Sequence, residues 1–465
     1  MSAPRDLFRL LLVAAACAVA TMPSAAAPLR DDTPAPASGD PAPAMQPLKK
    51  PASLRLRLRD GTKLVGKATA FNGEGFEFMP DAARGEAAPA ARTVRWLDVL
   101  PADLEGTAGK ILDEKRAEEL LLKGELLIVA GREKAGITAL ERAVKLDAAL
   151  KARANEARDR AVATVADAAH AEQLAKLREM SARIPKAGPV EPWPVLTRAE
   201  QEAAVAAMKA RAEEICRISG MQAVPVETKY FLLYAAAKPE AVKECARSLD
   251  AMYEAVLELF GIPPGLNLFW GKAVVLLQPN QEKFRLVEQA AFGQMTPPGV
   301  VGLCHQIGPQ VFVNIFWIDD QDLFDSTLIH EAVHGIVHRY HSPARLPDWA
   351  NEGLSEYIAA ITFKTSPVDK SRRPQALDFI RSGGSVADVM RLSYRNRTWP
   401  GPEAIGYAVG YVVVELMIRQ QPQKFGAWLR AIKGGKDWET ALREDFGYTV
   451  EAFAQTATDF YRRSK

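Results

Sequence analysis

Residues 325–338 read DSTLIHEAVHGIVH, and this stretch decides how the C-terminal part of the chain folds. Asp325 and the serine after it offer an N-cap, and apolar residues then recur at helical spacing, which predicts a helix that must be buried. His330 and His334 are four positions apart, so both imidazoles project from one face of that helix and can reach one metal ion. Glu331 lies beside them. Because the pattern H-E-x-x-H also arises by chance, it needs support from elsewhere in the chain.

A second motif supplies this support, since residues 346–357 read LPDWANEGLSEY. The motif follows at the distance that a turn and a returning helix require. Glu352 within it offers a carboxylate as a third ligand, and two imidazoles with one carboxylate suit Zn²⁺. The two motifs together predict a site for one zinc ion. His338 and His341 also follow the pentad, but a helix does not readily present three successive turns to one ion, so a solvated or capping role is expected for both.

With these two motifs the chain resembles the gluzincin metallopeptidases, which combine H-E-x-x-H with a downstream glutamate and include thermolysin-like and aminopeptidase N-like enzymes. The resemblance covers residues 195–465 and implies a zincin-like catalytic domain, with a mixed sheet, an active-site helix and a helical C-terminal part. By this likeness Glu352 is the third zinc ligand. Glu356, one turn later, stands where the family has an aspartate that hydrogen-bonds a ligand histidine. A metzincin site is excluded because Val337 and Tyr340 replace the glycine and histidine of that pattern.

The same resemblance implies roles for residues that do not bind the metal. A zinc ion with three protein ligands keeps one position open for water and lowers the pKa of that water. Glu331 would act as general base, taking a proton from the water and delivering it to the leaving amine. Tyr407 is similar to the tyrosine that stabilises the oxyanion in aminopeptidase N-like enzymes, and Tyr411 competes for this role. The segment that holds a free substrate amine in those enzymes is absent upstream of His330, so aminopeptidase specificity is not predicted.

The front half of the 195–465 domain alternates strand-like and helical segments, an order typical of a mixed sheet. Strands or helices are expected at 230–234, 239–260, 273–277, 300–304 and 311–316. Zincin substrates commonly pair with the edge strand that precedes the active-site helix, and residues 311–316 occupy that position in the sequence. Asn314 is the candidate substrate contact on this strand.

The rest of the chain is expected to form separate units, because 465 residues exceed what one hydrophobic core usually supports. Residues 53–102 alternate apolar and charged side chains between turns, which predicts a small SH3-like or Sm-like β barrel. Residues 103–184 are rich in helix formers and predict a helical region that resembles one tetratricopeptide hairpin. The Pro-rich segments 28–52 and 185–194 are typical of linkers. The predicted fold class is therefore α+β.

The N-terminus predicts export, since Arg5 and Arg9 precede an apolar run and small residues follow it. Residues 1–27 are interpreted as a signal peptide, periplasmic or secretory. The apolar run is too short for a comfortable membrane span, and an uncleaved anchor is the alternative. The remaining cysteines are too few and scattered for a disulfide framework or a cysteine-based zinc site, so buried thiols are expected, with a Cys216–Cys245 disulfide as the alternative.

These observations predict an exported zinc metallopeptidase that acts on a peptide or protein substrate. The N-terminal β and helical units could bind a protein partner. A net charge of +2 and the lack of a long like-charge block give no indication of nucleic acid binding. Two alternatives stay open: a zinc hydrolase of a nonpeptide amide, and a catalytically silent scaffold in which the zincin domain is only structural.

Overall fold

The computed structural model describes residues 44–463 apart from 83–89, 224, 298 and 364. The predicted signal peptide, residues 1–27, lies outside the described residues. Within the described ranges, no helix combines the length and the apolar character needed to cross a membrane.

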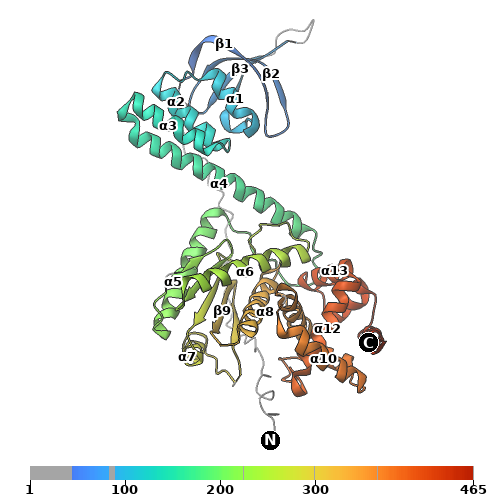
Figure 1. The fold of residues 1–465 in the computed structure, drawn as a ribbon. Coiled ribbons are helices and arrows are strands. Elements are labelled where there is room, and N and C mark those ends of the chain that lie inside the picture. The colour runs from blue at the N-terminus through green and yellow to red at the C-terminus, as the bar shows by residue number, and fades with distance from the viewer. Residues whose placement is uncertain (1–43, 83–89, 224, 298, 364, 464–465) are drawn as a thin grey trace. The chain divides into compact units, whose positions relative to one another are not determined.

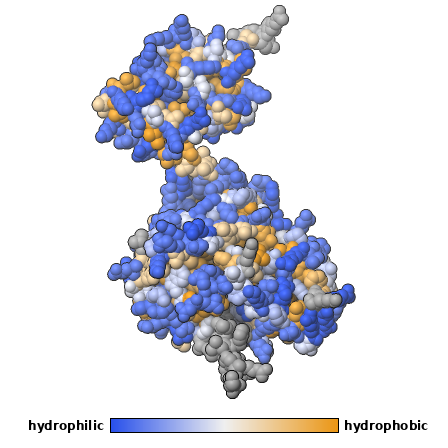
Figure 2. Space-filling model, viewed as in Figure 1, coloured by the Kyte–Doolittle hydropathy of each residue, from blue (hydrophilic) through white to orange (hydrophobic). Residues whose placement is uncertain are grey.

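The chain forms two compact units, an N-terminal unit within Ser24–Glu172 and a C-terminal unit within Gln173–Lys465. Helix α4 (Lys151–Ala182) begins in the N-terminal unit and ends in the C-terminal unit (Figure 1). On the face shown in Figure 2, both units expose mainly hydrophilic residues with smaller apolar areas among them. This surface agrees with a chain of which 25% of the residues are charged.

The N-terminal unit contains a four-stranded antiparallel sheet whose strands pair in chain order. Its strands are β1 (Gln46–Arg57), β2 (Lys63–Phe71), β3 (Gly75–Pro80) and β4 (Arg92–Arg95). In β1, Leu54 and Leu56 are buried while the arginines between and after them are exposed, as the alternation in the sequence predicts. The edge strands of this sheet are β1 and β4.

The predicted closed barrel is not present in this unit, because the sheet is open. Among the described residues, a single bridge between Leu58 and Val99 joins the end of β1 to the chain beyond β4. Strand β4 has four residues, and a 3-10 turn (Trp96–Asp98) follows it at once. The chain therefore leaves the sheet before β4 and β1 can form a ladder.

Helices α1 (Pro101–Ile111), α2 (Ala117–Val129) and α3 (Glu133–Leu146) complete the core of this unit together with the start of α4. Helices α2 and α3 form the hairpin that the sequence predicts, and two glycines lie where they meet. A Cβ atom on Gly124 would lie 2.8 Å from the side chain of Leu140, and one on Gly136 would lie 2.6 Å from the Gly124 carbonyl oxygen. The close approach of the two helices therefore favours glycine at both positions, most strongly at Gly136, where the added atom would meet a backbone oxygen.

The front half of the C-terminal unit contains a five-stranded mixed sheet in the order β5-β6-β7-β9-β8. Strands β6, β7 and β9 are parallel, and β5 and β8 pair antiparallel at the two edges. This mixed sheet agrees with the predicted α+β order. In chain order its elements are α5 (Arg198–Ser219), β5 (Val226–Glu227), β6 (Phe231–Ala235), α6 (Pro239–Leu259), β7 (Ala273–Gln278), α7 (Gln281–Phe292), β8 (Gly302–Ile307) and β9 (Gln310–Phe316).

The prediction that residues 311–316 form the edge strand is wrong, because they belong to β9, which lies between β7 and β8. The turn at Gly308, where φ is 56°, folds β8 back so that it pairs with β9 and forms the edge. Asn314 of β9 is fully buried and donates a hydrogen bond to Glu288 Oε1 of α7 at 2.8 Å. This side chain therefore serves the packing of α7 against the sheet.

The back half of the unit is helical (Figure 1). Its helices are α8 (Gln321–Arg339), α9 (Asp348–Thr362), α10 (Pro367–Arg381), α11 (Val386–Met390), α12 (Ile405–Gln420), α13 (Pro422–Lys433), α14 (Trp438–Ala441) and α15 (Val450–Arg463). Asp325 is not the N-cap of α8, as its position in the sequence suggested. Asp320 takes that place, and its Oδ1 accepts from the Leu323 amide at 3.0 Å. The helix starts earlier because the buried Phe324 extends its apolar face toward the N-terminus.

Two further features bear on the predictions. The segment 185–194 contains no helix or strand, but it packs against the end of α8, where Trp193 donates through Nε1 to the His338 carbonyl at 3.0 Å. The expectation of buried thiols is confirmed, since Cys216, Cys245 and Cys304 are all free and buried.

Candidate metal centre

Close packing at two glycines fixes the helices that carry the predicted site. A Cβ atom on Gly335 of α8 would lie 2.5 Å from the side-chain atom Cγ1 of Val311 on β9. A Cβ atom on Gly353 of α9 would lie 2.2 Å from the carbonyl oxygen of Gly410 on α12. Helix α8 therefore lies directly on the sheet, and α9 and α12 touch through their backbones. These contacts bring the pentad, the LPDWANEGLSEY motif and the segment around Tyr407 together.

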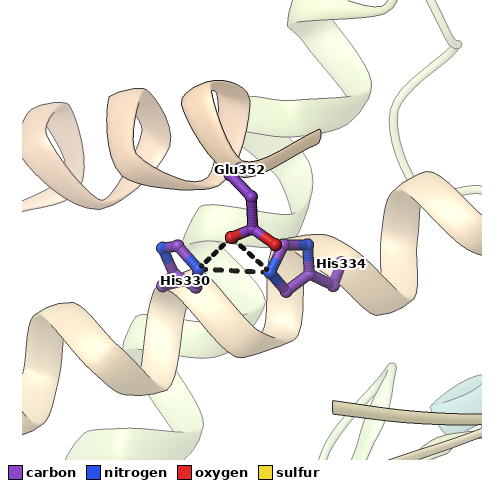
Figure 3. A group of neighbouring side chains, drawn as sticks. All are labelled: His330, His334 and Glu352. Carbon is purple, nitrogen blue, oxygen red and sulfur yellow. Dashed lines mark hydrogen bonds and ion pairs between the residues drawn. The ribbon is translucent and has the colours of Figure 1, made fainter. Parts of the chain in front are cut away.

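His330, His334 and Glu352 converge on one point between α8 and α9 (Figure 3). The Nε2 atoms of His330 and His334 are 3.1 Å apart. Glu352 Oε2 lies 3.1 Å from His330 Nε2 and 3.4 Å from His334 Nε2. All three residues are buried, and their ligand atoms lie within 4.8 Å of one another. The group could hold one metal ion.

The donor set fits a cation on physical grounds. A buried carboxylate is costly unless positive charge compensates it, and Glu352 is fully buried. Burial raises the pKa of Glu352, but the imidazoles of His334 and His330 outweigh it and hold the pKa at about 2. Glu352 is therefore ionised, and a cation at the convergence of two imidazoles and this carboxylate would complete its charge balance.

A serine and an asparagine from the second motif orient His334. Ser355 Oγ lies 3.1 Å from His334 Nδ1 and donates its own hydrogen to the Asn351 carbonyl at 3.1 Å. The Asn351 side-chain nitrogen Nδ2 lies 3.0 Å from the same ring nitrogen. When His334 carries its hydrogen on Nδ1, Ser355 Oγ accepts that hydrogen and the Nε2 lone pair is directed at the metal position. The resemblance had implied this role for Glu356, but the neighbouring Ser355 of the same motif takes it.

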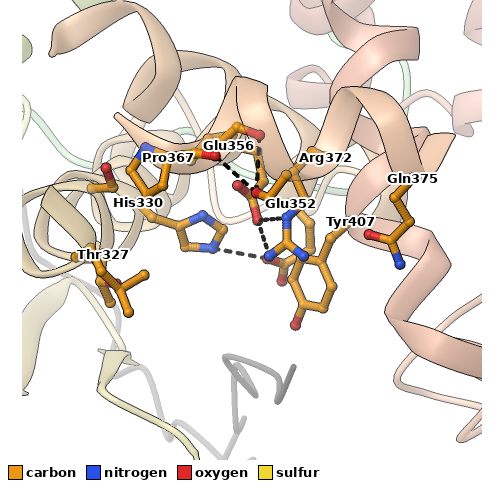
Figure 4. Close-up of polar contacts among 12 residues, drawn as sticks. Thr327, His330, Glu352, Glu356, Pro367, Arg372, Gln375 and Tyr407 are labelled. Carbon is orange, nitrogen blue, oxygen red and sulfur yellow. Dashed lines mark hydrogen bonds and ion pairs between the residues drawn. The ribbon is translucent and has the colours of Figure 1, made fainter. Parts of the chain in front are cut away.

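Glu356, the residue expected to hydrogen-bond a ligand histidine, is paired with Arg372 of α10 instead (Figure 4). Arg372 donates to Glu356 Oε1 through Nε at 3.0 Å and through Nη2 at 2.7 Å. The Arg372 guanidinium also lies over the Tyr407 ring, 5.1 Å from its centroid. Glu356 therefore supports the tyrosine side of the site, and Arg372 has no sequence motif that would have indicated it.

Glu331 is 1% exposed, and neither of its carboxylate oxygens has a hydrogen-bond partner among the described residues. Burial raises its pKa to about 8, His334 opposes that shift and Glu352 adds to it. Strand β8 passes close by, and a Cβ atom on Gly302 would lie 3.2 Å from Glu331 Cγ. A buried carboxyl with two unpartnered oxygens is costly to stability and is typical of functional sites.

Tyr407 lies beside the group, with its ring centroid 6.5 Å from that of His330. Its hydroxyl is 3.1 Å from the hydroxyl of Tyr394, which in turn donates to Glu352 Oε1 at 3.1 Å. Burial raises the pKa of Tyr407 well above its usual value. Tyr411, the competing candidate, donates instead to Asp369 of α10 at 2.7 Å. Tyr394 was not found from the sequence because it lies outside both motifs.

His338 and His341 lie outside the group. His338 Nε2 is 2.8 Å from the Gly308 carbonyl oxygen, and burial lowers the pKa of His338 to about 4. His341 Nδ1 is 3.3 Å from Ser181 Oγ. Neither imidazole belongs to the group formed by His330, His334 and Glu352. The expected solvated role does not fit His341, which is buried.

No protein-family model matches the chain, and no curated protein matches it either. The resemblance therefore rests on the site itself. The buried His330, His334 and Glu352 on α8 and α9 resemble an H-E-x-x-H…E zinc site.

Proposed function

We propose that this chain is an exported zinc metallopeptidase that hydrolyses peptide bonds. The observation that carries the proposal is the convergence of His330, His334 and Glu352 beside a buried carboxyl, Glu331, whose oxygens have no partner among the described residues. Two imidazoles and one carboxylate form the ligand set that catalytic zinc takes in many hydrolases. Export rests on the sequence of residues 1–27.

The three ligands would hold one zinc ion, which when bound supplies Lewis acidity and lowers the pKa of a water to about 7. Glu331 would act as the general base and then as the general acid. Its free oxygens take a proton from the attacking water and deliver it to the leaving amine. Tyr407 would donate a hydrogen bond to the oxygen that gains negative charge as the scissile carbonyl is attacked. Arg372, over the Tyr407 ring, keeps that ring in place.

The substrate would bind as an extended peptide along β8. This strand is the edge of the mixed sheet, so its outer backbone groups have no strand partner within the described sheet. Pairing with such an edge gives main-chain hydrogen bonds that do not depend on substrate sequence. Gly302 of β8 lies against Glu331, so a peptide on β8 would pass the general base.

Digestion of a peptide library by the purified, zinc-loaded protein, with products identified by mass spectrometry, tests the proposal. We expect cleavage by the wild type and none by Glu331→Gln, which should bind zinc as tightly as the wild type. His330→Ala should lose both zinc and cleavage. The matched control is His338→Ala, which removes a nearby imidazole that contacts Gly308 and should retain both. A zinc-loaded wild type that cleaves no peptide would refute the peptidase and favour a binding role.

A further inference from the structure

The two oxygens of Glu352 have different partners. Oε2 faces the Nε2 atoms of His330 and His334 at 3.1 and 3.4 Å, so it is the oxygen directed at the metal position. Oε1 accepts the hydroxyl hydrogen of Tyr394 at 3.1 Å. Because that oxygen is occupied, Glu352 presents one oxygen rather than two to the space between the imidazoles.

Tyr394 is fixed to the helix that carries Glu352 through its backbone as well as its side chain. Its amide donates to Oδ2 of Asp348 at 2.8 Å, and Asp348 is the first residue of α9, one turn before Glu352. Its ring packs on Trp399, 5.7 Å away between centroids. The loop that carries Tyr394 is therefore held to α9, and the Tyr394 hydroxyl keeps its position beside the Glu352 carboxylate.

The Tyr394 hydroxyl also contacts Tyr407. Tyr394 donates its hydroxyl hydrogen to Glu352. The hydroxyls of Tyr394 and Tyr407 are 3.1 Å apart. Hydrogen bonds connected in this way polarise one another. The same hydroxyl thus orients a metal ligand and lies beside the proposed oxyanion donor.

We propose that Tyr394 is a positioning residue of the metal site, which holds Glu352 to one oxygen. This inference rests on the proposed zinc site. Removing a group that hydrogen-bonds a metal ligand typically weakens metal binding about 10- to 100-fold. Tyr394→Phe deletes only the shared hydroxyl and keeps the ring on Trp399.

The test measures the zinc dissociation constant by competition with a chelating dye, on the full chain. Tyr394→Phe should bind zinc about 10- to 100-fold more weakly than the wild type. Tyr407→Phe should change zinc affinity less than about 3-fold, since its hydroxyl does not contact Glu352 directly, while it lowers kcat more than KM rises. Tyr411→Phe is the matched control, because this buried tyrosine of α12 bonds Asp369 instead and should leave zinc affinity unchanged.

A second variant and a second measurement test the same hydrogen bonds. Asp348→Ala releases the backbone of Tyr394 from α9 and should also weaken zinc binding. Cobalt-substituted Tyr394→Phe should show altered visible absorption bands, because Glu352 Oε1 is freed, whereas Tyr411→Phe should not. Wild-type zinc affinity in both Tyr394→Phe and Asp348→Ala would overturn the inference. A wild type that binds no zinc would refute the proposed function instead, so the two failures are distinguishable.

Discussion

A methyl group added at Gly353 tests whether the contact between α9 and α12 builds the site. The new Cβ would lie 2.2 Å from the Gly410 carbonyl oxygen, whereas ordinary contact begins near 3.4 Å. Both atoms belong to helix backbones, so no side chain can rotate away. The helices would have to separate by about 1 Å, which would move Glu352 on α9 away from Tyr407 on α12.

The expected cost follows from two opposing effects. Overpacking a rigid contact costs about 1–3 kcal/mol, and this backbone contact belongs near the upper end. Replacing glycine by alanine inside a helix returns about 1 kcal/mol. Gly353→Ala should therefore lower the free energy of unfolding of the C-terminal unit by about 2 kcal/mol, and it should weaken zinc binding because one ligand moves.

Denaturant unfolding followed by tryptophan fluorescence measures this change, since Trp349 is fully buried beside the contact. Gly426→Ala is the matched control within the same unit. Its Cβ would meet only the guanidinium end of Arg430, at 3.1 Å, which can move aside. That variant should be as stable as the wild type or gain up to about 1 kcal/mol. If Gly353→Ala is as stable as Gly426→Ala and binds zinc normally, the helix contact does not position the site.

Three further predictions follow from the same geometry. Burial raises the pKa of Glu331 to about 8, whereas the unfolded pKa is about 4.3, so the stability present below pH 4.3 is lost as the pH rises to 8. In metal-free protein, Glu331→Gln should therefore gain stability relative to the wild type between pH 5 and 8 in denaturant titrations. A difference that stays constant with pH would contradict this. Removing zinc with a chelator should lower the free energy of unfolding by about 2.7 kcal/mol compared with protein at zinc concentrations 100-fold above the dissociation constant, and His334→Ala should be insensitive to the chelator. Lys433 donates to the Val337 carbonyl at the end of α8 at 2.9 Å and to the Ala344 carbonyl at 2.8 Å. Lys433→Met should therefore destabilise the protein by about 2–4 kcal/mol in the same titrations. An unchanged midpoint would show that these carbonyls need no donor.

The helix of the pentad was predictable because its signals are local. His330 and His334 share a face through the helix repeat alone, and the apolar residues around them demand burial wherever the helix packs. The place of Glu352 beside the two histidines was predictable for a different reason. A motif so near in sequence, reached by a turn and a returning helix, has few places in which it can lie. The strands around residues 230–234 and 273–277 were also predictable, because short apolar runs of that kind are buried in a mixed sheet.

Pairing order and closure were not predictable from the same signals. Residues 311–316 are as apolar as an interior strand, but nothing local determines on which side β8 will pair. The open N-terminal sheet depends on the length of β4, and strand ends are set by competition with the following turn and helix. Both outcomes depend on tertiary contacts that a single sequence does not encode at those positions.

The residues behind the ligands show the same limit at the level of single side chains. Glu356 and Ser355 are adjacent on α9, and a helix turns by 100° per residue, so only one of them can face His334. The one-turn spacing of Glu352 and Glu356 placed Glu356 on the ligand face, but α10 supplies Arg372 on that side and Ser355 meets His334 instead. Tyr394 reaches Glu352 from a loop whose position depends on Asp348, 46 residues away in sequence. A motif thus specifies the atoms that bind a metal, whereas the atoms that orient them come from whichever element the fold packs alongside.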